Sequence, residues 1–163
     1  MAPKNHNNWL KRPTVEFISS KIYSDRTIYE EEIKNIFSKV WVPICHKSEL
    51  RNKGNFRTSS IAFQKVIAIN HGDRFSVYLN PSINSPSGKN VSVDGLIELP
   101  CEVKHGGMIW TTLDTNPSMS VEEWTCGAFD CISDAIDTEE MEVFHYHKAI
   151  IPTNYKLWHD TNS

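Results

Sequence analysis

Histidine and carboxylate side chains near the end of the sequence have types and spacing that could hold a metal ion. His145 and His147 are separated by one residue, and on a β-strand this spacing would point both rings to one face. His159 or Asp160 could supply the third ligand of a two-histidine, one-carboxylate set. Two-residue matches of this kind are common by chance, so we interpret His145 and His147 as partly exposed strand histidines.

The four cysteines are the next candidates for metal or redox chemistry. Two of them, Cys126 and Cys131, lie five residues apart on a predicted helix and therefore share a face poorly. We interpret these two and Cys101 as small buried side chains. The spacing of all four is unlike a disulfide framework, which favours a reducing, cytoplasmic setting. They are Cys45, Cys101, Cys126 and Cys131.

Two further histidines and the tryptophans have simpler structural interpretations. His46 follows the first predicted strand and is interpreted as a surface or capped histidine. His105 precedes Gly106-Gly107 and is interpreted as part of a turn. The tryptophans could line a ligand pocket, but tryptophans in folded domains are usually core or interface anchors. They are Trp9, Trp41, Trp110, Trp124 and Trp158.

The strongest β pattern, which must position the other elements, lies between Gly95 and Asp114. Two β-rich runs flank Gly106-Gly107, and this arrangement predicts an antiparallel hairpin. Because an isolated hairpin is marginal in water, other strands must pair with it. The expected strands cover 41–46, 56–63, 66–69 and 75–80, with a hairpin turn at 70–73.

Helices are predicted on both sides of these strands. The first begins at Ser24-Asp25 and continues at helical spacing to Val40. Ser120 and Glu123 have the form of a capping box and predict a second helix that continues to Ala135. Beyond these helices we expect a loop at 80–90, a short strand at 91–93, and two strands at 141–151 and 153–158.

Composition and charge limit the possible partners. The 163 residues are 39% hydrophobic, enough for a core of one domain, or of one small domain plus part of another. A net charge of -3 and a pI near 6.1 argue against a nucleic-acid partner. No apolar run approaches the length that crosses a bilayer, and the N-terminus lacks the apolar core of a secretory signal. We therefore expect no membrane partner.

Four stretches of the sequence occur in the order of a known family: IYSDRTIYEEEIKNIFSKVWVPICHKSEL (22–50), GNFRTSSIAFQKVIAINHGDRFSVYLN (54–80), GLIELPCEVKHGGMIWTTLD (95–114) and NYKLWHDTN (154–162). Together they resemble the large (α) subunit of Rieske non-haem iron oxygenases, the ring-hydroxylating dioxygenases. The first two are similar to the helix and strands before the first cluster-binding loop. The third, the hairpin, is similar to the segment that closes the Rieske domain, and the fourth to the entry of the iron-binding helix.

This resemblance implies an α+β fold that is mainly antiparallel β. We expect an N-terminal arm at 1–20 and a truncated Rieske-like β domain with an N-terminal helix at 21–114. The beginning of an α+β catalytic domain is expected at 115–163. Family members carry a Rieske [2Fe-2S] cluster and a mononuclear Fe(II), with which they hydroxylate aromatic or related organic substrates using O2.

The sequence departs from the family at both metal sites. A Rieske cluster needs two cysteines and two histidines, which the family supplies as Cys-x-His and Cys-x-x-His. Neither spacing occurs in this sequence. The family places these ligand loops between the counterparts of 78–80 and 87–89, which here are joined by a short Pro/Ser/Asn stretch. The iron ligands would follow NYKLWHDTN.

We therefore predict no catalytic, cofactor-binding or metal-binding residue in this chain, and no cofactor of its own. The expected function is that of a non-catalytic remnant or partial product of a Rieske-type oxygenase α subunit. Full-length oxygenase subunits are the expected partners. The alternative is a small metal-free binding or interaction module on a Rieske-derived scaffold.

Overall fold

Two compact units make up the chain in this computed structural model, which describes residues 19–79, 82–131, 134 and 141–162. One unit joins 1–32 to 148–163, and the other covers 33–147. Almost all of the arm predicted at 1–20 lies outside the described residues. Among the described residues, no helix is long and apolar enough to cross a membrane.

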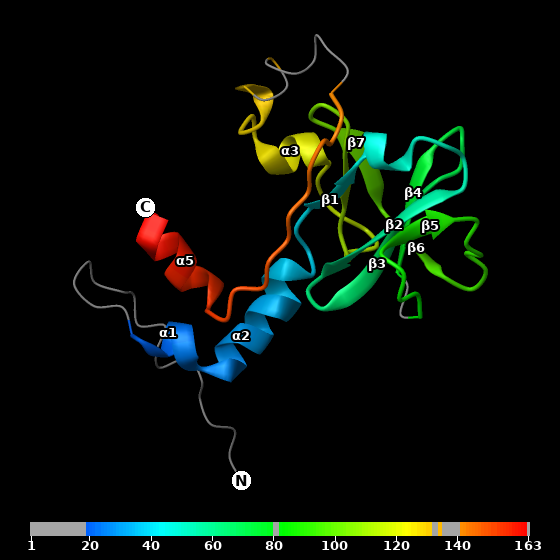
Figure 1. Cartoon of the computed structure of the whole chain (residues 1–163). Helices are drawn as coiled ribbons and strands as arrows, with labels where there is room; N and C mark the ends of the chain where they lie inside the picture. Colours follow the sequence, from blue (N-terminus) through cyan, green and yellow to red (C-terminus); the bar gives the residue numbers. More distant parts are fainter. Residues whose placement is uncertain (1–18, 80–81, 132–133, 135–140, 163) are drawn as a thin grey trace. The chain divides into compact units, whose positions relative to one another are not determined.

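The larger sheet of the second unit has five antiparallel strands in the order β5-β2-β3-β4-β6 (Figure 1). The turn between β3 and β4 forms as predicted, because the Asn70 side chain accepts from Gly72 N at 2.6 Å and Gly72 has a φ of +98°. The turn between β2 and β3 has positive φ at Ala62 and Phe63 and contains no glycine. The strands are β2 (Asn55–Ile61), β3 (Gln64–Asn70), β4 (Phe75–Leu79), β5 (Ser87–Lys89) and β6 (Ile97–Leu99).

The smaller sheet has the order β1-β8-β7 and contains the predicted hairpin. Strands β7 (Cys101–Lys104) and β8 (Met108–Thr111) pair antiparallel across a turn in which all three residues, 105–107, have positive φ. Strand β1 (Val42–His46) pairs with the other edge of β8. The first arm of the hairpin is divided at Pro100, since β6 before it belongs to the larger sheet.

The two sheets enclose the main hydrophobic core. Residues of β1 and β8 pack there against residues of β2, β3, β4 and β6. The other face of the larger sheet carries a second cluster around Phe56 and Tyr78, which is covered by side chains of 83–96. Val91 and Val93 contribute to that cover as part of a loop, so the strand predicted at 91–93 is wrong. The predicted loop at 80–90 contains β5.

The helices are shorter than the sequence pattern predicts. The first predicted helix is present as α2 (Arg26–Glu32) and a π-helical segment, Ile33–Phe37, and one further turn, α1 (Lys21–Ser24), precedes the predicted start. A capping box at Ser120 and Glu123 begins α3 (Val121–Thr125) as expected, with Ser120 Oγ accepting from Glu123 N at 3.2 Å. Helix α3 then ends because Cys126 and Gly127 both have positive φ. Ile132 and Ala135 lie outside the described residues.

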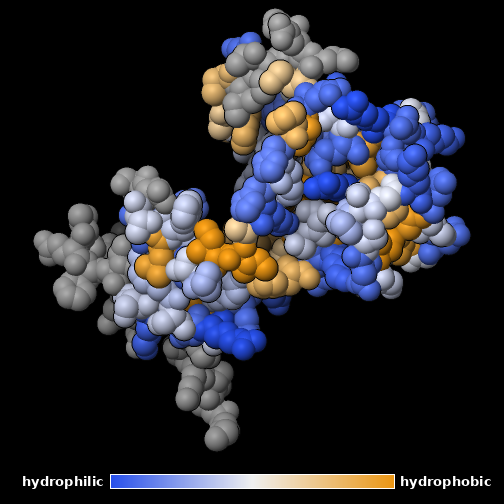
Figure 2. Space-filling view, viewed as in Figure 1, coloured by the Kyte–Doolittle hydropathy of each residue, from blue (hydrophilic) through white to orange (hydrophobic). Residues whose placement is uncertain are grey.

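The two strands predicted near the end of the chain are wrong. Residues 141–150 are extended without pairing to a strand, and α5 (Tyr155–Asn162) is a helix. Asn154 begins α5, because its side-chain oxygen accepts from Lys156 N at 3.0 Å. Large apolar side chains of 141–151 are exposed, with Phe144 fully so. Figure 2 shows hydrophobic (orange) patches interspersed with hydrophilic (blue) surface along the path that this stretch takes in Figure 1.

Within the first unit, α5 packs with α1 and α2 through polar contacts. Lys156 Nζ forms an ion pair with Glu32 at 2.7 Å, and both side chains are largely buried. Asn154 Nδ2 donates to Tyr23 O at 3.0 Å, and the Tyr23 hydroxyl donates to the Asp160 carboxylate. These contacts occupy residues of the stretch that resembles the entry to an iron-binding helix.

Candidate functional site

Cys45 and Cys101 lie on the two strands that flank β8. In the register, Cys45 is opposite Ile109 and Cys101 is opposite Thr111. Burial, together with nearby acidic groups, raises the pKa of Cys45 to about 12 and that of Cys101 to about 11. Both are free thiols of the inter-sheet core, as the sequence predicts for Cys101, whereas Cys126 and Cys131 are exposed rather than buried. Both lie beyond the short α3, which ends at Thr125, and Cys126 itself has a positive φ.

His46 is buried and both of its ring nitrogens are engaged. Nε2 donates to the carbonyl of Gly106 at 2.7 Å, and Nδ1 accepts from Ser48 N at 3.1 Å. The carbonyl can only accept and the amide can only donate, so the ring has its proton on Nε2. His46 therefore caps the 3-10 helix Lys47–Leu50 and ties β1 to the hairpin turn. The capped interpretation of this residue is confirmed.

His105 occupies the hairpin turn, as predicted, and packs among aromatic rings. Its ring centroid lies 5.2 Å from that of Phe129 in a stacked arrangement and 5.7 Å from that of Trp110 in an edge-on one. Nε2 is 3.4 Å from the Thr125 hydroxyl. His105 thus joins the turn to α3 and to the residues after it.

The cysteines and histidines of this unit do not fit a Rieske cluster. Cys45 and His46 are neighbours on one strand, so their side chains point to opposite faces of the sheet. Cys45 and Cys101 face the inter-sheet core, whereas His46 and His105 line a pocket on the other face. Four ligands to one cluster must converge, and these four are divided by a sheet. These four side chains therefore do not form a set of ligands for one cluster.

The histidines considered for a mononuclear metal site have other surroundings. His145 and His147 lie in the exposed, extended stretch, so the strand that would align their rings does not form. On α5, the Asp160 carboxylate accepts from Tyr23, and the His159 ring packs edge-on against Tyr155. Among the described residues, no group of three histidine, cysteine or carboxylate side chains is arranged to hold a metal ion.

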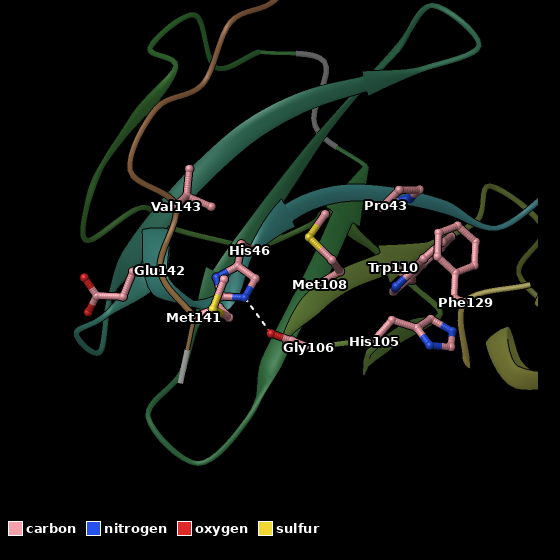
Figure 3. A pocket seen from close by; sticks show the side chains of 10 residues that line it. All are labelled: Pro43, His46, His105, Gly106, Met108, Trp110, Phe129, Met141, Glu142 and Val143. Atoms are coloured by element: carbon pink, nitrogen blue, oxygen red, sulfur yellow. Dashed lines mark hydrogen bonds between the residues drawn. The ribbon is translucent and has the colours of Figure 1, made fainter. Parts of the chain in front are cut away.

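The outer face of the smaller sheet instead carries an apolar pocket of about 310 Å³ (Figure 3). A β-bulge between Pro43 and Cys45 places both Ile44 and Cys45 in the core and leaves Pro43 and His46 on the pocket side. Met108 and Trp110 line it from β8. The remaining walls come from the hairpin turn, from Phe129 and from residues 141–143.

The tryptophans are predicted to be core or interface anchors rather than the lining of a ligand pocket. Trp41 and Trp110 are buried, in a cluster with Val121, and Trp41 Nε1 donates to Met119 O at 2.9 Å. Trp124 and Trp158 are exposed instead. Trp110 also lines the pocket. Met108 and Trp110 alternate onto one face of β8, and this pattern is the part of the sequence that indicates the pocket. The wall formed by 141–143 is far away in sequence, so no local pattern indicates it.

No family model matches the chain, whereas individual proteins do. The methanesulfonate monooxygenase hydroxylase α subunit of Methylosulfonomonas methylovora is 36% identical over 215 positions, which cover 99% of this chain and 52% of the relative. The 2-aminobenzenesulfonate 2,3-dioxygenase α subunit of an Alcaligenes species is 26% identical, over 91% of this chain and 48% of the relative. The chain thus spans about half the length of these relatives.

The first of these alignments also reveals a gap. It extends over 215 positions and the chain has 163 residues, so at least 52 aligned positions of the relative have no counterpart here.

Solved structures share the fold. A quaternary ammonium Rieske monooxygenase superimposes with a TM-score of 0.62 at 19% identity, covering 74% of this chain and 44% of the other. Naphthalene 1,2-dioxygenase from a Rhodococcus species gives a TM-score of 0.64 at 17% identity, with coverages of 74% and 36%. The predicted α+β class with mainly antiparallel sheets is confirmed. The relatives and structural neighbours of this chain are Rieske oxygenase α subunits, oxidoreductases of which it corresponds to only a part.

Proposed function

We propose that this chain is a non-catalytic remnant or partial product of a Rieske-type oxygenase α subunit, with neither a cluster nor a mononuclear iron of its own. The observation that carries the proposal is the absence of Cys-x-His and Cys-x-x-His from the whole sequence. The division of Cys45 and Cys101 from His46 and His105 by a sheet supports it, because the available donors cannot replace the missing loops.

The alignment gap supports the same proposal. We assign most of the unmatched positions to the connection between β4 and β6, where the resemblance places the cluster-binding loops. In this assignment 21–114 is a truncated Rieske-like domain and 115–163 begins a catalytic domain. O2-dependent hydroxylation would then belong to the parent family and not to this chain alone.

Metal analysis after anaerobic purification tests this proposal. We expect neither stoichiometric iron nor labile sulfide, and no visible absorption from an iron–sulfur cluster. A matched positive control is a chimera that carries the corresponding segment of the methanesulfonate monooxygenase α subunit between Leu79 and Ser87. The chimera should gain both signals, and stoichiometric iron with sulfide in the unaltered chain would overturn the proposal.

We further propose full-length oxygenase α subunits as partners, in the reducing cytoplasm that four free thiols favour. The exposed apolar side chains of 141–151 support an interaction role. Co-expression with a tagged full-length relative tests it, since a stable complex should co-purify.

The second candidate function, a metal-free binding module, is favoured by one observation, the apolar pocket on the smaller sheet.

A further inference from the structure

We propose that the pocket on the outer face of the smaller sheet binds a small, neutral, largely apolar molecule that carries one hydrogen-bond acceptor, and that the Trp110 indole N–H holds this acceptor. The inference goes beyond the proposed remnant, and it deepens the second candidate function, the binding module that the same pocket favours. It does not depend on the absence of a cluster, because the pocket and the core cysteines lie on opposite faces of the sheet.

Trp110 supplies the argument for a ligand. Its side chain is only 3% exposed, and its Nε1 is buried with no acceptor among the described residues. Leaving a buried donor unpaired costs about 1–3 kcal/mol, and an acceptor on a bound molecule would remove that cost. Figure 3 shows the nitrogen edge of the indole turned toward the side of the pocket between Met108 and His105.

The indole is held in this orientation by aromatic neighbours. Phe129 packs edge-on against it with centroids 5.4 Å apart, and His105 does so at 5.7 Å. Because these rings restrict the indole, its N–H has a fixed direction in the pocket. A ligand therefore gains a positioned donor without ordering a mobile side chain.

The size and walls of the pocket define the rest of the ligand. A volume of about 310 Å³ lies at the lower end of the range for small-molecule sites, which are mostly apolar with a few polar groups. Met108, Phe129 and Met141 supply flexible and aromatic apolar surface. Such walls suit a single substituted ring or a short branched chain.

The charged and polar groups at the rim already have partners, which favours a neutral ligand. Glu142 forms an ion pair with Arg51 at 2.6 Å, and His46 uses both ring nitrogens within the fold. The wall itself is fixed to the same unit, because Val143 N donates to the Ser48 hydroxyl at 3.0 Å. A charged ligand would lose its hydration without gaining a counter-charge.

Three probes of similar size separate the contributions of the hydrogen bond, of apolar burial and of charge to binding. Acetophenone carries a ring and one acceptor, ethylbenzene lacks the acceptor, and benzoate is charged. The whole chain is titrated with each probe, and binding is monitored by calorimetry and by the indole N–H resonance of Trp110. Acetophenone should bind most tightly. One hydrogen bond predicts a preference over ethylbenzene of about 2- to 10-fold. Benzoate should bind most weakly.

Substitutions identify the donor. Trp110→Phe keeps an aromatic ring and removes the N–H, so the preference for acetophenone should disappear. Trp124→Phe is the matched control, because Trp124 is 43% exposed and does not line the pocket. Should Trp110→Phe fail to fold, Val143→Trp fills the pocket from its wall and should abolish binding of both neutral probes.

Three results would overturn the proposal. They are equal affinity for acetophenone and ethylbenzene, a preference that survives Trp110→Phe, and binding of no probe to the unaltered chain.

Discussion

Two neighbouring residues, Cys45 and His46, have the side-chain types of cluster ligands and serve different parts of the fold. The thiol of Cys45 is buried between the sheets, and the imidazole of His46 joins a helix cap to a hairpin turn. The strand directs them to opposite faces, so adjacency in sequence does not bring them together in space. Their roles here are structural, and two measurements test this.

The free energy of unfolding should fall at alkaline pH, because the two core thiols lose their protons more readily in the unfolded state than in the folded state. Burial raises the pKa of Cys45 from 9.0 to about 12, so the folded state keeps its proton where the unfolded state loses it. The stabilisation is complete below pH 9 and is lost as pH rises toward 12, by at most about 1.4 kcal/mol per pH unit for this thiol. Urea unfolding between pH 8 and 11 should show a shallower decline for Cys45→Ala than for Cys131→Ala, whose thiol is exposed. Equal slopes would contradict the assignment.

Removing the His46 ring should destabilise the fold. In His46→Ala the Gly106 carbonyl and the Ser48 amide lose their partner, and the expected loss in the free energy of unfolding is about 1–3 kcal/mol. Chemical denaturation measures this loss. His145→Ala serves as the control, because His145 is exposed and a surface substitution of this kind changes stability by about 0.5 kcal/mol or less. A His46→Ala variant as stable as the control would count against the capping role.

At the scale of elements, the β7–β8 hairpin belongs to the smaller sheet, follows β6 of the larger sheet, and lines the pocket with side chains of β8. Its turn has positive φ at His105, Gly106 and Gly107, and Lys47 N donates to Gly107 O at 2.8 Å. The turn is therefore attached to the end of β1 as well as to its own strands. Because of that attachment, the turn cannot move to accommodate an added side chain without losing contacts to β1.

Substituting Gly107 should be more damaging than substituting a glycine in open space. In Gly107→Ala the new Cβ would lie 2.8 Å from His46 Nε2, at a φ of +102°, and we expect a loss of about 1–3 kcal/mol. Gly95 also has a positive φ, +75°, but nothing lies within 4 Å of its Cβ position. Thermal unfolding should thus show a larger drop for Gly107→Ala than for Gly95→Ala, and equal drops would refute the crowding argument.

The sequence predicts those elements that are determined by residues close to one another in the chain. The hairpin, the β3–β4 turn and the start of α3 follow from alternation, from Asn70-His71-Gly72-Asp73 and from the Ser120–Glu123 capping box. The sequence predicts a strand where α5 forms, because the aromatic residues there favour β structure and outweigh the cap signal at Asn154. The pocket was missed because its wall at 141–143 meets Trp110 only through tertiary packing.

At the scale of the whole molecule, the stretch 141–151 is the most exposed apolar part of the described chain. Phe144 is fully exposed and Ile150 is 96% exposed, although neighbouring residues make contacts within their own unit. Tyr146, for example, lies beneath the Arg57 guanidinium at 5.1 Å. Extended backbone with apolar side chains and no strand partner favours association with another chain.

Self-association should decrease when these apolar side chains are replaced. The double variant Phe144→Ser and Ile150→Ser removes the two most exposed of them and should tolerate a several-fold higher concentration before light scattering rises. Lys148→Ser, in the same stretch, changes a charge without removing a comparable apolar side chain and should not reproduce the improvement. Unchanged scattering in the double variant would show that this stretch does not drive association.

The pairing of β1 with β8 has a consequence for the entropy of chain closure. Val42 pairs with Thr111, so 69 positions of sequence separate the two. Closure entropy grows only with the logarithm of loop length, so adding 52 positions between them, where we propose that the unmatched positions belong, would raise its cost by about 0.5 kcal/mol. The two sheets can therefore assemble almost equally well with a long or a short connection. If this chain has lost metal-binding loops, as proposed above, this weak dependence is the physical reason why the scaffold would persist without them.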